Sequence, residues 1–396
     1  MDILKQAQAL SNELKEIYQK LHKNPELGFE LEKTIGIITS YLDKINVKYH
    51  TDGKFILCEI GKNEGETFLL RADMDALPIS EESGLLYASQ NGNCHACGHD
   101  MHATMLLGAV KLLNEADLQG KVLCLFQPAE EILQGAKYVL DKGVLDNVTA
   151  GMMLHTMTAM PFETGTVIVS SAGESAPSAD YFTIRIKGKG GHGSSPHLCT
   201  DPILASANII TSLQALNSRE IPQNKPLVLT FGEIHGGEAH NIIPDQGTLK
   251  GTFRTFDENI RQTVRTRLCE ISQSVSQTFK ATSEVTFDSG CPTLLNDKNV
   301  SECVHKTLVN LLGKDKVFTS DEVNKNSSLG NGSEDFSYVS HKIPTVMVAI
   351  SAGNKADGFS YPLHNPKVKF DLNAIPFGVA VYSASAIEYL NKKGGV

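Results

Sequence analysis

Apolar residues recur at helical spacing in some stretches of the chain and form short unbroken runs in others. The stretch from Leu10 to Leu21 predicts a helix that ends before Pro25, and a second predicted helix runs from Ile35 to Leu42. Apolar runs bounded by glycine predict buried strands of a parallel sheet covered by helices. The predicted strands are 55–60, 67–70, 122–126 and 150–154, with further β structure over 164–171 and a helix over 105–113.

The pattern changes near Ala176, where 181–187 alternates between apolar and polar residues like a half-exposed antiparallel strand. The next segments predict, in order, a helix over 202–218, strands over 227–232 and 247–255, a helix over 258–279 and a strand over 283–288. This β-α-β-β-α-β order is that of a ferredoxin-like domain. Past Cys291 the pattern returns to helices around one buried strand, 346–350, and ends in a helix over 373–390. We therefore predict an α/β domain, residues 1–178 and 291–396, with an inserted α+β domain, residues 179–290.

Composition narrows the class of protein. The 396 residues are enough for two or three domains, and 41% hydrophobic with 20% charged residues is typical of a soluble globular protein. The net charge of -9, without a basic cluster, argues against nucleic acid as a partner. No leader sequence or membrane-spanning apolar segment is recognised, and the eight scattered cysteines fit a reducing compartment, so we expect a cytoplasmic protein without membrane contact.

The nine residues from Cys94 to His102 contain two thiols, three imidazoles and a carboxylate. These side chains bind transition metals, and Gly98 permits a sharp turn between neighbouring ligands. The Cys-x-x-Cys within the window could also be a redox dithiol or half of a structural zinc site. A redox pair has no need of three adjacent histidines, and a structural zinc site would need a second, tightly spaced Cys or His pair, which the sequence lacks. We therefore expect a metal site whose other ligands come from distant parts of the chain.

Further candidate ligands follow predicted strands. Asp73 and Asp75, two positions apart, should project from the same side, although solvated loop carboxylates or a helix cap explain this segment equally well by itself. Glu130 and Glu131 follow strand 122–126 and should point in different directions, so that one can bind metal while the other faces an attacking water. Strand 150–154 ends at His155, which would be one more ligand.

Several motifs together resemble a known family. They occur in the order Arg71–Pro78, His95–Asp100, Phe126–Glu131, Leu154–His155, Gly188–Ser194, Asn241–Asp245, Gly251–Phe256, Ser333–Phe336 and Leu363–Pro366. This set resembles the aminoacylase and carboxypeptidase G family of metallopeptidases. Within that family it is most similar to the branch of hippurate hydrolase, bacterial N-acyl-amino-acid amidohydrolases and plant indole-acetyl-amino-acid hydrolases. The resemblance runs from about Leu21 to the last predicted helix.

The resemblance implies a phosphorylase/hydrolase-like catalytic domain with two divalent metal ions per subunit. It implies that the metal ligands are Cys97, His99, Glu131, His155 and His364, that Glu130 is the general base, and that Asp75 orients a ligand. Zinc is favoured by a thiolate with imidazoles, and the family also works with manganese, cobalt or nickel. Two positions depart from the branch: Cys94 stands where methionine is common, and Thr156 where asparagine is common.

The resemblance also implies roles for the inserted domain. It would act as a lid, hold the substrate through His192, Asn241 and Arg254, and form the contact of a homodimer. The guanidinium of Arg254 suits a substrate carboxylate. Among the other histidines, His95 and His102 flank the metal window and are candidates for supporting the ligands, while His22 is interpreted as an ordinary surface or core residue.

Three functions remain open from the sequence. The first is hydrolysis of N-acyl-L-amino acids, N-acetyl or N-benzoyl for example, by a metal-activated water with Glu130 as general base. The second is dipeptidase or carboxypeptidase activity at the same centre. The third is a catalytically inactive metal-binding or interaction protein on the same fold, against which the complete ligand set and Glu130 count.

Overall fold

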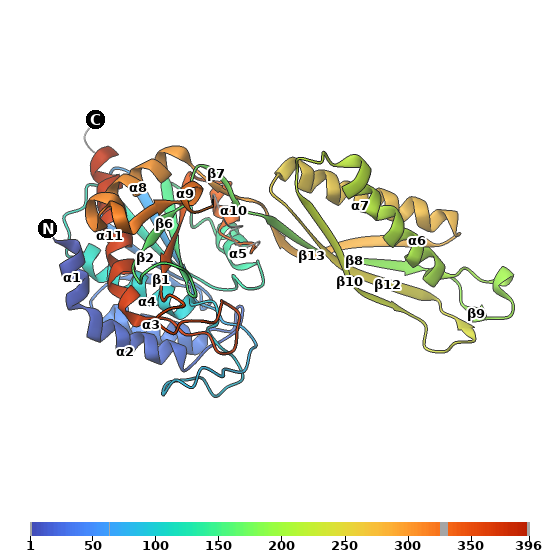
Figure 1. Ribbon diagram of the computed structural model, residues 1–396, viewed down its shortest axis with the longest axis horizontal. Coiled ribbons are helices and arrows are strands. Elements are labelled where there is room, and N and C mark those ends of the chain that lie inside the picture. Colours follow the sequence, from blue (N-terminus) through green and yellow to red (C-terminus); the bar gives the residue numbers. More distant parts are fainter. Residues whose placement is uncertain (1, 63, 325–331, 394–396) are drawn as a thin grey trace. The chain divides into compact units, whose positions relative to one another are not determined.

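The computed structural model describes residues 2–62, 64–324 and 332–393. Contacts divide the chain into two compact units (Figure 1). The first consists of Met1–Gly173, Leu295–Leu329 and Tyr338–Val396, and the second of Glu174–Leu294 and Gly330–Ser337. The predicted domain boundaries at 178/179 and 290/291 stay predictions, and positions 1, 63, 325–331 and 394–396 of the predicted catalytic domain lie outside the described residues.

An eight-stranded sheet forms the centre of the first unit, in the order β1-β2-β4-β3-β5-β16-β6-β15. The central strands β4, β3, β5 and β16 run parallel, whereas β1, β2 and the β16–β6 pair are antiparallel. The strands are β1 (Tyr49–Thr51), β2 (Ile56–Gly61), β3 (Thr67–Asp73), β4 (Lys121–Gln127), β5 (Ala150–Met157), β6 (Val167–Val169), β15 (Val317–Thr319) and β16 (Thr345–Ser351). Nearly every residue of β3, β4 and β5 is buried, which explains why these segments read as unbroken apolar runs. The predicted α/β class is confirmed.

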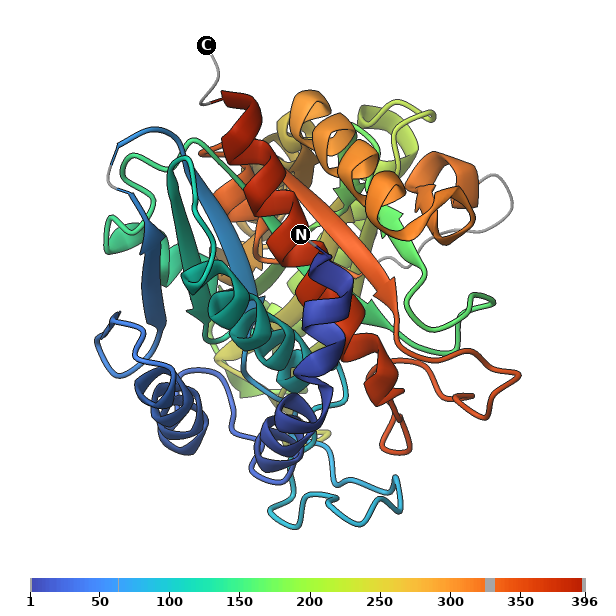
Figure 2. The same ribbon diagram turned by 90° about the vertical axis from the view of Figure 1, so that its left-hand side faces the viewer.

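Helices surround this sheet (Figures 1 and 2). They are α1 (Ile3–Ala9), α2 (Ser11–His22), α3 (Glu32–Lys44), α4 (His99–Asn114), α5 (Gly135–Asp141), α8 (Lys298–Leu312), α9 (Ser320–Asn324), α10 (Ser337–Ser340) and α11 (Ile375–Lys393). Helices α4 and α11 pack against each other and against β3, with α1 beside α11 and α2 beside α4. Their close approach depends on glycine, because a Cβ at Gly108 would collide with Val379 and one at Gly378 with Met105. No helix in the described residues is both long and apolar enough to span a bilayer.

Two elements of the first unit extend further than their apolar patterns predict. The helix predicted over 105–113 begins at His99, inside the window of candidate ligands. The strand predicted over 150–154 continues to Met157, so that His155 lies within β5 rather than after it. The apolar run stops at His155, but backbone pairing with β16 continues past it. Strand length is therefore decided here by the neighbouring strand.

The second unit contains a four-stranded antiparallel sheet in the order β10-β12-β8-β13. Helices α6 and α7 lie side by side on one face of it (Figure 1), over a core that includes Phe182, Leu249 and Phe253. This is the predicted ferredoxin-like arrangement. The elements are β8 (Ser178–Lys187), α6 (Pro202–Ala215), β10 (Leu227–Gly236), β12 (Gln246–Thr255), α7 (Glu258–Thr278) and β13 (Thr282–Cys291). Two short pairs are also present: β9 (Gly191–His192) with β11 (Ile242–Ile243), and β7 (Gly173–Ala176) with β14 (Leu294–Asn296).

Candidate metal centre

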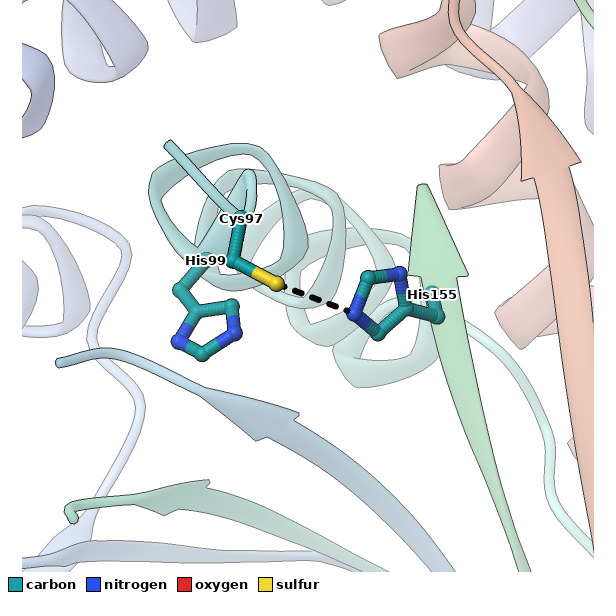
Figure 3. Close-up of side chains that lie close together, drawn as sticks. All are labelled: Cys97, His99 and His155. Carbon is teal, nitrogen blue, oxygen red and sulfur yellow. Dashed lines mark hydrogen bonds between the residues drawn. The ribbon is translucent and has the colours of Figure 1, made fainter. Parts of the chain in front are cut away.

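The turn from Cys97 to His99 leads into α4 and carries two of the predicted ligands. Gly98 precedes the first residue of the helix and has φ +86°, in the left-handed region that favours glycine. A Cβ at this position would also collide with the hydroxyl of Thr156 and approach the ring of Phe370. Glycine is thus required by both the backbone and its surroundings, and the turn places Cys97 and His99 on the same side of the end of α4 (Figure 3).

Cys97, His99 and His155 form the first group of donor atoms (Figure 3). Sγ of Cys97 lies 3.5 Å from Nε2 of His155, and one donor atom from each of the three residues lies within 4.8 Å of the others. Nδ1 of His155 is 2.8 Å from the backbone carbonyl of Thr156, which can only accept, so Nδ1 carries the ring proton. The lone pair of Nε2 is therefore directed at the thiol, as a metal ligand requires.

Cys97, Glu131 and His364 form a second group that shares the thiol with the first. Nε2 of His364 lies 3.3 Å from Sγ of Cys97 and 3.7 Å from Oε2 of Glu131. His364 has φ +63°, unusual for a residue with a side chain, and its backbone N–H is held by the carbonyl of Ala96. Its side chain is 55% exposed, whereas the other predicted ligands are nearly buried. His364 therefore lies on the accessible side of the centre.

Asp75 connects His99 to the two glutamates. Its Oδ1 lies 3.4 Å from Nδ1 of His99, and its two carboxylate oxygens accept the backbone N–H groups of Glu130 and Glu131, each at 3.1 Å. Nε2 of His99 in turn lies 3.9 Å from Oε2 of Glu130 and 3.8 Å from Oε1 of Glu131. Ala129, with φ +55°, forms the turn that presents both glutamates. A carboxylate behind an imidazole is the usual support of a metal-binding histidine.

The side chains present fit a divalent metal ion. Nε2 of His99 and Oε1 of Glu131 are buried and make no hydrogen bond within the described residues, which is costly for polar atoms. Burial raises the pKa of Glu131 to about 7 despite the nearby charge of His99, and burial raises the pKa of the Cys97 thiol as well. A cation would lower both pKa values, because it stabilises the thiolate and carboxylate that bind it. A thiol, three imidazoles and a carboxylate form a donor set suited to zinc and its neighbours.

His102 lies next to this centre but its nitrogens are already engaged. Nδ1 is 2.6 Å from Oδ1 of Asp73, and Nε2 is 2.8 Å from the backbone nitrogen of Thr156. Burial lowers the pKa of His102 to about 3, against the charge of Asp73, so the ring is neutral. Although Asp73, His99 and His102 lie close together, His102 has no free donor atom for a metal.

His22, interpreted from the sequence as an ordinary residue, belongs to a buried ionic cluster beside the metal window. Its Nδ1 lies 2.7 Å from Oδ2 of Asp100 and its Nε2 3.0 Å from Oε1 of Glu81. Burial opposes the charged ring, but the hydrogen bonds to Asp100 and Glu81 raise the pKa of His22 to about 9. No local signal marks this cluster, because the three residues are far apart in the sequence.

The three predicted substrate-binding residues lie in the second unit. His192 is exposed on β9. The residue after it, Gly193, donates its backbone N–H to the backbone carbonyl of Asn241 at 2.8 Å. Arg254 is the last residue but one of β12, a strand that begins at Gln246, three residues after the end of β11. Arg254 lies eight steps along the strand from Gln246, or roughly 27 Å at 3.4 Å per residue. His192 and Asn241 are thus neighbours, and Arg254 lies at the other end of the sheet.

Comparison with known proteins shows which family this chain resembles. Residues 69–388 match the model of peptidase family M20/M25/M40. The chain is 36% identical over 384 residues to IAA-amino acid hydrolase ILR1-like 2 of Arabidopsis thaliana, covering 95% of this chain and 85% of the relative. It is 34% identical to thermostable carboxypeptidase 2 of Saccharolobus solfataricus, covering 97% and 98% of the two chains.

A solved structure agrees with these relatives. A dinuclear metal-binding peptidase of the M20 family from Bacillus subtilis superposes with a TM-score of 0.79 at 30% identity, covering 97% of this chain and 99% of that one. The resemblance predicted from the motifs is thereby confirmed. The chain belongs to peptidase family M20/M25/M40 and is a hydrolase of that family, whose members include metal-dependent amidohydrolases and peptidases.

Proposed function

We propose that this protein hydrolyses the amide bond of N-acyl-L-amino acids, such as N-acetyl or N-benzoyl derivatives, at a centre of two divalent metal ions. The observation that carries the proposal is the sharing of the Cys97 thiol by two groups of donor atoms, with the Glu130 carboxylate next to them. The name of the plant relative, an IAA-amino acid hydrolase, supports an amino-acid conjugate as substrate. The proposed ligands are Cys97, His99, Glu131, His155 and His364.

The chain's own residues divide the chemistry between them. Bound divalent ions would polarise the substrate carbonyl and lower the pKa of a water molecule toward neutrality. Glu130, 6% exposed and fixed through its backbone by Asp75, takes the proton of the attacking water and passes it to the leaving amine. The charge of Asp75 lies 3.4 Å from Nδ1 of His99, on the side of the ring away from the centre, which leaves Nε2 facing the glutamates. Hydrolysis then needs no covalent intermediate with the enzyme.

We further propose zinc as the preferred ion. A thiolate and imidazoles are soft ligands that suit zinc, whereas manganese prefers harder oxygen ligands. Manganese, cobalt and nickel are the alternative ions that the family resemblance implies. The eight cysteines, all within the described residues, form no disulfide. Cysteines without disulfides support the proposed cytoplasmic location, since a reducing compartment keeps thiols reduced.

We propose that substrate binding depends on a homodimer. Arg254 would bind the carboxylate of the amino acid, and His192 and Asn241 would contact the scissile amide. Within one chain, β12 separates Arg254 from the other two residues by several times the length of an N-acyl amino acid. This separation supports a site in which His192 and Asn241 come from the partner subunit of a homodimer formed through the inserted unit.

A second candidate function is peptidase activity at the same centre. It is favoured by the similarity to a protein named as a carboxypeptidase, which covers almost the whole of both chains. The substrates differ only in whether the acyl group is itself an aminoacyl residue. An inactive binding protein is the weakest alternative, since it would have no need of Glu130.

Amine release from a panel of substrates tests the proposal. The purified protein, loaded with zinc or manganese, is incubated with N-acetyl, N-benzoyl, N-indoleacetyl and dipeptide substrates, with and without a chelator. We expect chelator-sensitive release from at least one N-acyl amino acid, and release at least about 10²-fold slower from Glu130→Gln. Preferential cleavage of dipeptides would favour the second function, and release that survives complete metal removal would contradict both.

A further inference from the structure

Behind the candidate metal centre, the side chain of His102 connects three elements that carry proposed ligands or their supports. His102 belongs to α4, Asp73 to β3 and Thr156 to β5. The 2.6 Å contact to Asp73 and the 2.8 Å contact to the backbone of Thr156 use both ring nitrogens. All three residues have no exposed surface. The group is therefore a cross-link inside the unit.

The direction of each hydrogen bond follows from the atoms involved. The backbone N–H of Thr156 can only donate, so Nε2 of His102 is the acceptor and carries no proton. Nδ1 then carries the ring proton and donates it to the carboxylate of Asp73, which Arg71 holds in its charged form at 2.7 Å. The hydroxyl of Thr156 lies 2.9 Å from the same Nε2 and therefore also donates to it.

The order hydroxyl, imidazole, carboxylate is that of a Ser-His-Asp triad, but a nucleophilic role is excluded here. A nucleophile must be reachable by its substrate, and Thr156 and His102 have no exposed surface. Nε2 of His102 also accepts the backbone N–H of Thr156. To act as a general base, the ring would have to give up this hydrogen bond, which joins α4 to β5. The chain of hydrogen bonds can act only through the residues that it touches.

Those residues are the proposed metal ligands and their neighbours. Thr156 follows His155 on β5, and its hydroxyl lies against Gly98, between Cys97 and His99. The His102 ring lies with its centre 4.6 Å from that of the His155 ring and 5.4 Å from that of His99. Oδ2 of Asp73 lies 3.8 Å from Nε2 of His99. The hydrogen-bonded series thus lies next to a proposed ligand at each end: His155 beside Thr156, and His99 beside Asp73.

We propose that His102 and Thr156 are positioning residues, and that the Thr156–His102–Asp73 chain sets the separation between the ligands on the α4 turn and His155 on β5. The inference rests on the metal centre proposed above. The Thr156 hydroxyl contributes twice, because it adds a hydrogen bond to His102 and fills the space beside Gly98. Loss of this hydroxyl leaves the fold intact but lets the α4 turn, with Cys97 and His99, shift relative to His155 on β5.

Three variants separate positioning from general stability. Thr156→Val removes the hydroxyl but keeps the shape and the backbone N–H, and Thr156→Ser keeps the hydroxyl. Thr158→Val is the matched control: Thr158 is also buried at the end of β5, and its hydroxyl donates to the backbone carbonyl of Lys369 at 3.1 Å, away from His102. Each full-length protein is stripped of metal and titrated with Co²⁺, and the absorption bands of the cobalt thiolate are recorded with the dissociation constant and the thermal midpoint.

We expect Thr156→Val to weaken Co²⁺ binding by roughly 10–100-fold and to change the cobalt spectrum, as loss of a group supporting metal ligands does. Thr156→Ser should restore both, and Thr158→Val should lower the thermal midpoint without altering either. Equal metal affinity and identical spectra for Thr156→Val and wild type would overturn the positioning role while leaving the proposed hydrolase intact. A wild-type protein that binds no Co²⁺ would overturn the proposed centre and this inference with it.

Discussion

The carboxylate of Asp75 accepts the backbone N–H of Glu130 across 55 positions of sequence, at 3.1 Å. Its second oxygen accepts the N–H of Glu131, and Oδ1 also lies 3.4 Å from His99. One buried side chain thereby holds the proposed base, one proposed glutamate ligand and one proposed histidine ligand in a common arrangement.

Asp75→Asn should lower both metal affinity and kcat. An asparagine has only one carbonyl oxygen to accept from the two backbone N–H groups, and it places no negative charge beside His99. We expect roughly 10–100-fold weaker metal binding, measured by competition with a chelator. Asp52→Asn, on the surface of the same unit, is the control. An Asp75→Asn protein with wild-type metal affinity and turnover would show that the contacts of Asp75 do not support the centre.

Cys97→Ser should strip the metal and the activity, whereas Cys94→Ser should keep both. Cys97 Sγ faces two histidines, while Cys94 is a buried thiol whose pKa is raised to about 12 by burial, with the carboxylates of Glu81 and Asp100 adding to the shift. Elemental analysis of the two purified variants gives the metal content directly. The opposite pattern of metal loss would exclude Cys97 as a ligand.

Glu130→Gln and Glu131→Gln should fail in different ways. The first should keep its metal while kcat falls by roughly 10²–10⁴-fold, the range for loss of a general base. The second should lose metal affinity, because Glu131 lies 3.7 Å from His364 in the second donor group. Metal titration and turnover are measured on both. If both proteins bind metal as wild type does, the division of roles is wrong.

The stability of the protein should fall between about pH 6.5 and 9 because of His22. A histidine whose pKa is raised in the folded state stabilises the fold fully below its unfolded pKa and loses that contribution as the pH rises through the folded value. With a folded pKa of about 9 against 6.5 for an unperturbed histidine, the contribution is on the order of 3 kcal/mol. Urea unfolding at several pH values checks it.

His22→Gln should be less stable than wild type at pH 6.5 and should show a much flatter dependence between pH 6.5 and 9. His197→Gln, at an exposed position, should follow the wild-type curve. A His22→Gln curve parallel to that of wild type would show that the ring does not gain a proton in the buried cluster.

Mixing two inactive variants should restore activity if His192 acts in the partner subunit. Glu130→Ala and His192→Ala each lack one group, and a mixed dimer pairs the intact Glu130 of one chain with the intact His192 of the other. Random exchange makes about half of the dimers mixed, each with one good site of two, so activity should reach about a quarter of wild type. Absence of recovery in a mixture shown to contain mixed dimers would assign His192 to its own chain.

Much of the fold follows from local features of the sequence. Unbroken apolar runs identify β3 and β4 because both faces of these strands are buried, and alternation identifies β8 because one face is not. The density of candidate ligands between Cys94 and His102 predicts a metal site without reference to the rest of the chain. Such features persist in any tertiary context, since they depend on spacing and side-chain chemistry alone.

Other features were decided only by tertiary structure. Pairing with β16 carries β5 past His155, and the packing of α4 against β3 and β5 gives both nitrogens of His102 their partners. The cluster of His22 with Glu81 and Asp100 arises in the same way. These contacts join residues that are tens of positions apart. They depend on which strands and helices become neighbours, and the periodicity of apolar residues along a chain carries no information about that order.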